Sequence, residues 1–221
     1  MTTAYLALWV IDLESFMIKS FKTALLILLS LLILVSCTGS IVTLKYENGH
    51  MINKRLGLSY VAAPLNYQPV SVGEAYGYYE KADLTLYEIK GLDPEKWLTE
   101  EYSGASTTVF YSKDITLPTL TELGANKIFI CLEGEIIYSL ATVEDIELIN
   151  EVIDLFENGE SVEWPLIDSI QRYEIKFYSE DNYPHIYYNL SYGEFPEGKF
   201  LYDRSTKRCV EIGDLLKDYI G

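Results

Sequence analysis

Near the end of the chain, four short segments rich in β-branched and aromatic residues follow one another with very short gaps. Such segments are typical of β-strands, and they occupy residues 173–179, 184–195, 199–203 and 208–212. Parallel neighbours would need a long crossover connection, whereas these gaps hold only a few residues. The spacing therefore predicts an antiparallel meander, and it constrains the fold more than any other feature of the sequence.

Further strands and a hairpin precede this meander. Residues 82–90 and 106–112 have strand-like composition. Within residues 127–141, two apolar runs flank Glu133-Gly134, which is typical of a β-hairpin turn. Most of the chain is therefore expected to form antiparallel sheet.

The helices are expected to be few and short. A capping box at residues 142–145, followed by apolar residues at helical spacing, predicts a helix over about 143–157. Asp93 as N-cap, with Pro94 in the first helical position, predicts a short helix after residue 92. The expected fold class is α+β, built from antiparallel β meanders and hairpins with a few short helices.

Two stretches of the chain share one pattern. Residues 127–149 and 199–220 each run strand, tight turn, strand, acidic cap and predicted helix, and Asp214 caps the second helix, over 214–220. A duplicated β-hairpin–helix unit would explain the pattern. Because hairpin–helix is a common arrangement, coincidence would explain it too.

An apolar run near the start of the chain ends in small residues and a cysteine. Lys19 and Lys22 precede the run at residues 24–35, and Ser36 and Cys37 follow it. A basic start, a short apolar stretch and a small residue predict a secretory signal peptide. The run is shorter than the roughly 20 residues that a membrane-spanning helix needs.

The tetrapeptide Leu34-Val35-Ser36-Cys37 resembles the lipobox of bacterial membrane lipoproteins. The resemblance implies cleavage between Ser36 and Cys37 and a diacylglycerol group on the Cys37 thiol. Acyl chains such as palmitate would then hold the protein at the outer face of the cell membrane. An uncleaved helix over 16–35 is one alternative, and an ordinary thiol behind an ordinary signal peptide is another.

The chain is expected to divide into a leader and an exported domain. Asp12 and Glu14 are unusual ahead of a signal peptide, which favours Met17 as the true start of translation. The expected parts are a signal peptide (1–36), a tether with the start of the mature chain (37–58), and an extracytoplasmic α+β domain (59–221) with two possible subdomains (about 59–160 and 161–221).

The charge of the chain limits its partners. The sequence holds 33 acidic and 17 basic residues, a net charge of −16. Nucleic-acid binding needs a basic footprint, so a nucleic-acid partner is disfavoured. An acidic surface is also repelled by anionic lipid, so membrane attachment depends on the lipid anchor.

The sequence contains no recognisable catalytic, metal-binding or cofactor-binding motif. No cofactor is therefore expected. Acid pairs such as Glu100/Glu101 and Glu133/Glu135 resemble the paired carboxylates of glycosidases, but a chain this acidic contains such pairs by chance.

Tyrosines and cysteines complete the candidate residues. Strand alternation places Tyr188 and Tyr192 on one face and Tyr187 on the other. Exposed, Tyr188 and Tyr192 would bind a sugar or peptide; buried, they would simply pack in the sheet. Cys131 and Cys209 lie in predicted strands, where either a disulfide or two free thiols would fit.

The sequence favours a lipid-anchored surface lipoprotein with a non-enzymatic binding domain. Its partner would be a protein, a wall component or a small ligand. A cell-envelope hydrolase that uses paired carboxylates is the alternative, and a structural role in an envelope complex is a third possibility. A concave site with converging carboxylates would favour the enzyme.

Overall fold

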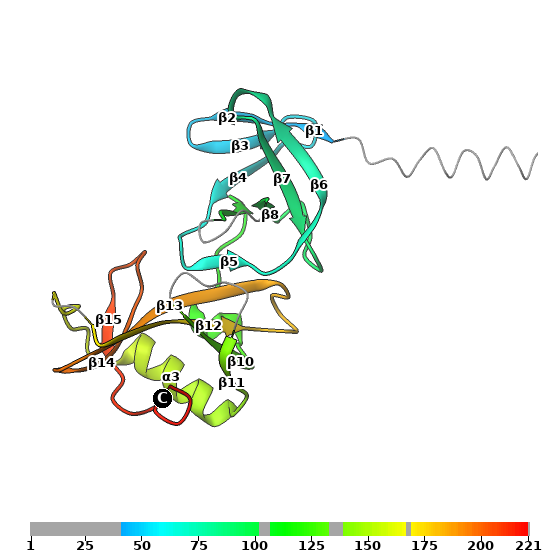
Figure 1. Cartoon of the computed structure of the whole chain (residues 1–221). Helices are drawn as coiled ribbons and strands as arrows, with labels where there is room; N and C mark the ends of the chain where they lie inside the picture. Colours follow the sequence, from blue (N-terminus) through cyan, green and yellow to red (C-terminus); the bar gives the residue numbers. More distant parts are fainter. Residues whose placement is uncertain (1–40, 102–106, 133–138, 167–168, 221) are drawn as a thin grey trace, which may run out of the picture. The chain divides into compact units, whose positions relative to one another are not determined.

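The computed structural model describes residues 41–220 apart from 102–106, 133–138 and 167–168, and these described residues belong to one compact unit (Figure 1). The predicted signal peptide, the possible start at Met17, the cleavage site at Ser36 and the lipid attachment at Cys37 lie outside the described residues.

The first sheet has eight strands, all antiparallel except for β1, which pairs with β6 in parallel. A short 3₁₀ turn, η1 (Glu80–Ala82), joins β6 to β7. In spatial order the strands are β1 (Val42–Thr43), β6 (Val72–Tyr79), β7 (Leu84–Ile89), β8 (Trp97–Glu100), β9 (Val109–Ser112), β4 (Leu58–Ala62), β3 (His50–Asn53) and β2 (Lys45–Glu47).

The second sheet has seven strands and contains the meander that the sequence predicts. Its main path is β11 (Ser139–Val143), β10 (Lys127–Leu132), β12 (Gln171–Tyr178), β13 (Ile186–Phe195), β14 (Gly198–Tyr202) and β15 (Cys209–Glu211), all antiparallel. The seventh strand, β5 (Tyr67–Pro69), comes from the first part of the chain and pairs with β13. The predicted meander and the predicted hairpin are both confirmed, while the turn at Glu133-Gly134 lies outside the described residues.

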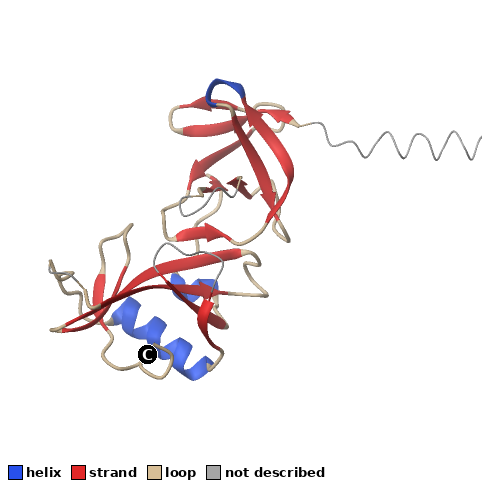
Figure 2. Ribbon diagram, in the orientation of Figure 1, coloured by secondary structure: helices blue, strands red, loops and turns tan. Residues whose placement is uncertain are grey.

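The main core lies between the second sheet and α3 (Ile146–Asn158), which packs on one face of it (Figure 2). The helix buries Ile149, Val152, Ile153 and Phe156, the 3.6-residue stripe that the sequence indicates. These side chains join Ile175 and other strand residues in one cluster. A short helix, α2 (Leu120–Leu123), also lies in this cluster, so the predicted α+β class is confirmed.

The start of α3 differs from the sequence prediction. Asp145 is the N-cap, and its carboxylate accepts hydrogen bonds from the backbone N–H groups of Glu147 and Leu148. Thr142, the expected cap, pairs with Phe129 inside β11. The helix therefore begins three residues later than predicted, because the hairpin continues through the expected cap.

The helix predicted after Asp93 is wrong. Asp93 does close one turn, since its carbonyl accepts from the N–H groups of Lys96 and Trp97. From Trp97 the chain becomes strand β8, which pairs with β9 and buries Trp97, Leu98 and Thr99. Sheet pairing and burial outweigh the local capping signal here.

The helix predicted over 214–220 is also wrong. This segment is a run of turns, with hydrogen bonds from Lys217 N–H to Asp214 O and from Tyr219 N–H to Leu216 O. The Asp214 carboxylate accepts a 2.7 Å bond from Lys199 Nζ on β14 instead of capping a helix. The two hairpins therefore do not belong to a duplicated hairpin–helix unit.

The division of the folded chain also differs from the expectation. Strands β1, β2 and β3 lie within residues 37–58, the segment expected to hold the tether and the start of the mature chain, so sheet structure starts at Val42. Strand β12 pairs with β10 across the expected boundary near residue 160. Apart from β5, which joins the second sheet, the change from one sheet to the other falls between β9 and β10.

Candidate functional site

The predicted aromatic stripe is buried. Tyr188 and Tyr192 do share a face of β13, but they are only 8% and 2% exposed. Tyr188 packs edge-to-face against Tyr67 of β5, with ring centroids 5.2 Å apart, and Tyr192 packs against Tyr173. The ligand-binding role considered for Tyr188 and Tyr192 is therefore wrong, because the core around α3 covers the face that they share.

A buried polar network fixes Tyr188 in place. Its hydroxyl donates to Asp203 Oδ2 at 3.2 Å, and Asn66 Nδ2 donates to the same oxygen at 3.4 Å. Asp203 Oδ1 accepts from the N–H groups of Ser205 and Thr206. Burial and the nearby Asp203 charge raise the pKa of Tyr188. The bonds of Asp203 all run to neighbouring protein groups, which indicates a structural role.

A second buried polar group lies on the other face of β12. Lys176 is fully buried and Glu174 is 5% exposed. Their charged atoms, Nζ and Oε2, lie 3.5 Å apart, and Nζ lies 5.6 Å from the ring centre of Tyr187. Neither Nζ nor Oε2 has a hydrogen-bond partner among the described residues. The ion pair is therefore the main compensation for burying both charges.

Both described cysteines are free thiols. Cys131 and Cys209 are buried and unpaired, which decides between the two possibilities left by the sequence. Burial raises the pKa of Cys209 to about 11. Burial also raises the pKa of Cys131, although the positive charge of Lys176 opposes the shift. Neither thiol is activated for nucleophilic chemistry.

These thiols predict a loss of stability at alkaline pH. Unfolded cysteine ionises near pH 8.5, whereas the folded thiols stay protonated, so the unfolded chain binds fewer protons. The free energy of unfolding should therefore fall as the pH rises from about 8 to 10. Urea denaturation across this range checks the slope. The Cys131→Ala/Cys209→Ala variant should flatten it, and an unchanged slope would contradict this origin.

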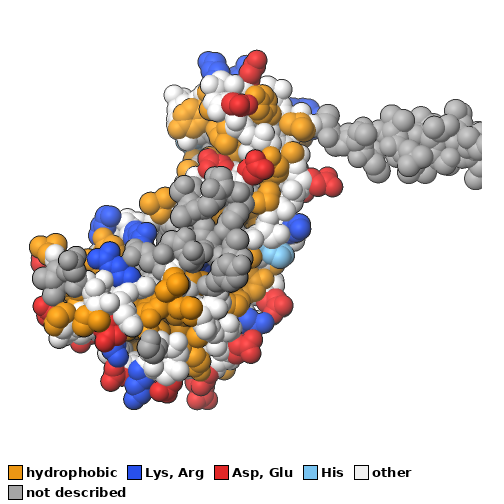
Figure 3. Space-filling model, viewed as in Figure 1, with side chains coloured by type: hydrophobic (Ala, Val, Ile, Leu, Met, Phe, Trp, Pro, Cys, Tyr) orange, Lys and Arg blue, Asp and Glu red, His pale blue; other side chains and the backbone are white. Residues whose placement is uncertain are grey.

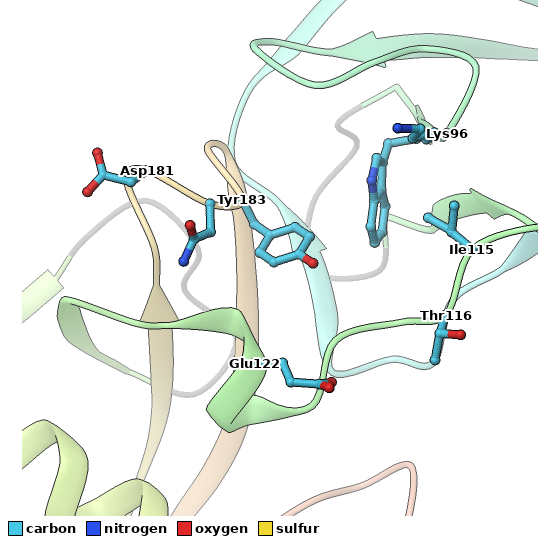
Figure 4. Close-up of a pocket in the computed structure, with 8 residues that line it drawn as sticks. Lys96, Ile115, Thr116, Glu122, Asp181 and Tyr183 are labelled. Atoms are coloured by element: carbon cyan, nitrogen blue, oxygen red, sulfur yellow. The ribbon is translucent and has the colours of Figure 1, made fainter.

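A candidate site is a pocket of about 600 Å³, here called the aromatic pocket. Three segments far apart in the sequence build it: the start of β8, the stretch from β9 to α2, and the loop between β12 and β13 (Figure 4). Its lining residues are Lys96, Trp97, Ile115, Thr116, Glu122, Asp181, Asn182 and Tyr183.

Two aromatic side chains form one wall of the aromatic pocket. Trp97 is held by pairing of β8 with β9, and its ring lies 6.4 Å from that of Tyr111. Tyr183 meets Trp97 edge-to-face at 6.0 Å. Trp97 is only 5% exposed, whereas Tyr183 and Ile115 are half-buried. A ligand would therefore meet Tyr183 and Ile115 first, with the indole edge at the floor.

Helix α2 shapes the opposite wall. Thr119 and Glu122 form a capping box at its start. At its end, Gly124 has a positive φ of 64°, and a Cβ there would lie 2.6 Å from Asn182 Nδ2. Asn182 Nδ2 instead donates to the carbonyl of Leu123 at 3.4 Å. The close approach at Gly124 thus positions the Asn182 amide beside the pocket.

The two carboxylates of the aromatic pocket do not converge. In Figure 4, Asp181 points away from Tyr183, and Glu122 extends in a different direction. Glu122 Oε2 already accepts the N–H of Thr119 at 2.9 Å. Of the acid pairs noted in the sequence, Glu100 Oε2 accepts from the N–H of Thr108, and Glu133/Glu135 lie outside the described residues. This arrangement suits binding better than paired-carboxylate hydrolysis.

The sequence did not identify the aromatic pocket. Trp97 lay in a predicted helix, and Tyr183 lay in a loop between predicted strands. A strand assignment for residues 97–100, followed by pairing with 109–112, would have brought Trp97 into the sheet. The contact of Trp97 with Tyr183, however, joins a strand of the first sheet to a loop of the second and leaves no local pattern.

Searches for other kinds of site gave three negative findings. Within the described ranges, no group of three or more His, Cys, Asp or Glu side chains is placed to hold a metal ion. None of the helices in that part of the chain is both long and apolar enough to cross a membrane. No protein-family model, curated protein or solved structure matches this chain.

Proposed function

We propose that the protein is a lipid-anchored surface lipoprotein whose folded domain binds a ligand in the aromatic pocket. The export and anchoring parts of the proposal are supported by Lys19, Lys22, the apolar run at 24–35 and the lipobox ending at Cys37. Each buried acyl CH₂ contributes about 0.8 kcal/mol, so two chains on one residue give stable attachment.

The aromatic pocket carries the binding proposal. Its volume of about 600 Å³ has room for a small ligand. Tyr183 and Ile115 offer apolar surface, while Thr116, Asn182 and Glu122 offer hydrogen-bonding groups at its edge. An apolar wall beside hydroxyl, amide and carboxylate groups matches a sugar ring, which has an apolar face and a rim of hydroxyls. We therefore propose a saccharide of the cell wall as the ligand class.

Binding is favoured over the alternative hydrolase function. A glycosidase needs two carboxyl groups on opposite sides of one bond. Asp181 and Glu122 point in different directions, and one oxygen of Glu122 is engaged in the capping box of α2. The pocket therefore offers contacts for a sugar without a pair of groups aimed at one bond.

Tryptophan fluorescence can test the binding proposal. The sequence has three tryptophans, and the proposed cleavage before Cys37 removes Trp9, so Trp164→Phe leaves Trp97 as the sole reporter. Titrating this detergent-solubilised protein with N-acetylglucosamine disaccharide is expected to change the Trp97 emission in a saturable way. Tyr183→Ala should weaken binding about tenfold, the effect of losing roughly 1.4 kcal/mol of ring contact.

The matched control for Tyr183→Ala is Tyr46→Ala. Tyr46 is 52% exposed on β2 and does not line the aromatic pocket. Its replacement should leave the titration unchanged. An emission that stays flat up to millimolar disaccharide would contradict the saccharide proposal, and equal effects of the two variants would contradict the assignment to this pocket.

Anchoring has its own test. Cys37→Ala should abolish incorporation of labelled palmitate, because the acylated thiol is removed. The same variant should retain its leader in the intact mass, since cleavage follows lipidation in the proposed maturation. Cys131→Ala removes a buried thiol and should keep the label. Labelling that persists in Cys37→Ala would place the acyl group elsewhere and overturn the proposed anchor.

A further inference from the structure

We propose that one end of the first sheet, here called the anchor-proximal face, lies against the lipid headgroups of the membrane that holds the anchor. This face consists of exposed residues on and beside β2, β3 and η1: Ile41, Lys45, Tyr46, Lys54, Leu56 and Lys81. The inference rests on the proposed lipidation of Cys37. It goes further by assigning the surface that touches the membrane.

The chain between the anchor and the fold is very short. Only residues 38–40 separate Cys37 from Ile41. A fully extended chain spans at most about 3.5 Å per residue, so Ile41 lies within roughly 14 Å of the lipidated Cys37. This reach exceeds the thickness of the headgroup region on one side of a bilayer, about 5–8 Å, by only about two extended residues.

The fold prevents this tether from lengthening. Val42 and Thr43 pair with Gly77 and Tyr78, and the N–H of Leu44 donates to Tyr78 O at 2.8 Å. Leu44 is buried directly over Gly77, where a Cβ would lie 2.8 Å from the leucine side chain. Detaching β1 would expose Leu44 and break the pairing, so the start of the sheet stays close to the anchor.

The exposed chemistry of this face suits a membrane interface. Tyr46 is 52% exposed and its ring lies 6.1 Å from that of Tyr79. The two tyrosines line a shallow cavity of about 280 Å³, whose charged lining residues are Lys45, Lys81, Glu47 and Glu80. Amphipathic tyrosine rings and lysines are enriched at the level of the headgroups. Hydrophobic and basic side chains lie together over this end of the sheet, with a few acidic ones (Figure 3).

Charge distinguishes this face from the rest of the domain. Residues 41–58 hold three basic residues and one acidic residue, a net charge of +2. Residues 59–221 hold 12 basic and 30 acidic residues, a net charge of −18; of these, Glu80 and Lys81 of η1 belong to the face and cancel each other. Glu47, the one acid in the first segment, is paired with Lys54 at 2.9 Å. An anionic leaflet therefore repels most of the domain but does not repel the anchor-proximal face.

Fluorescence quenching by lipid tests the assignment. A bimane label is attached at Tyr46→Cys or, in a separate protein, at Ile146→Cys on α3, two sites of similar exposure at 52% and 49%. The buried Cys131 and Cys209 should not react, and acylation blocks Cys37. The lipidated protein is reconstituted into vesicles of phosphatidylcholine and phosphatidylglycerol that contain a nitroxide-headgroup lipid.

The label at residue 46 is expected to lose most of its emission in these vesicles, and the label at residue 146 should keep its emission. Equal quenching at the two sites, or none at residue 46, would overturn the assignment of the face. Leu56→Cys provides a second labelled position if Tyr46→Cys folds poorly. Intact mass reports separately whether Cys37 is acylated, so a bare Cys37 would identify failure of the proposed anchor rather than of the face.

Discussion

Lys176→Met is expected to lower the free energy of unfolding by about 3–5 kcal/mol. Methionine has a similar length and fits the same space, but it removes the positive charge that lies 3.5 Å from the buried Glu174 carboxylate. Glu174 Oε2 has no hydrogen-bond partner among the described residues to offset this loss. Guanidinium denaturation monitored by circular dichroism measures the change.

The double variant Glu174→Met/Lys176→Met separates charge from packing. Replacing both members of a buried pair by apolar residues is often neutral or stabilising. The double variant should therefore regain the stability that Lys176→Met loses. If the single variant stays within about 0.5 kcal/mol of the wild type, or the double variant is as unstable as the single one, the ion pair does not have the role described.

Asp203→Ala is expected to lower the free energy of unfolding by about 3 kcal/mol. The substitution removes the acceptor for the Tyr188 hydroxyl, the Asn66 amide and two backbone N–H groups. Asp203 is 1% exposed, so water cannot easily replace these bonds. Asp203→Asn keeps one acceptor oxygen and should lose less. Equilibrium denaturation in urea would rank the two variants.

An exposed acid provides the control for Asp203. Asp214 accepts a 2.7 Å bond from Lys199 Nζ on the protein surface. Exposed pairs of this kind contribute about 0–1 kcal/mol. Asp214→Ala should therefore change stability little. A loss in Asp203→Ala that is no larger than the loss in Asp214→Ala would show that the buried network contributes little to stability.

The second sheet could be predicted because its constraints are local. Short gaps leave antiparallel pairing as the only connection for β12, β13, β14 and β15. The apolar stripe of α3 predicts both that this segment is a helix and which face of the helix is buried. Alternation also placed Tyr188 and Tyr192 on one face, but whether that face is covered depends on packing against α3, which strand alternation does not reveal.

The wrong predictions have a common physical cause. Asp93 and Asp214 both carry a helix-capping signal, and each is overruled by a partner outside its own segment. Pairing of Trp97 with Tyr111 extends β8, and Lys199 engages the Asp214 carboxylate. The aromatic pocket was missed for the same reason, since its walls come from three segments that only the folded chain brings together.

Strand β5 has a consequence for how the chain is made. Tyr67–Pro69 leaves the ribosome long before Ile186–Tyr188, the stretch to which it hydrogen-bonds. Until that stretch has been made, the backbone amide and carbonyl groups of β5 lack their pairing partners on β13. The pairing of β5 is therefore completed only when the final third of the chain has been synthesised. A prematurely terminated chain would keep an unpaired strand edge that can associate with other chains.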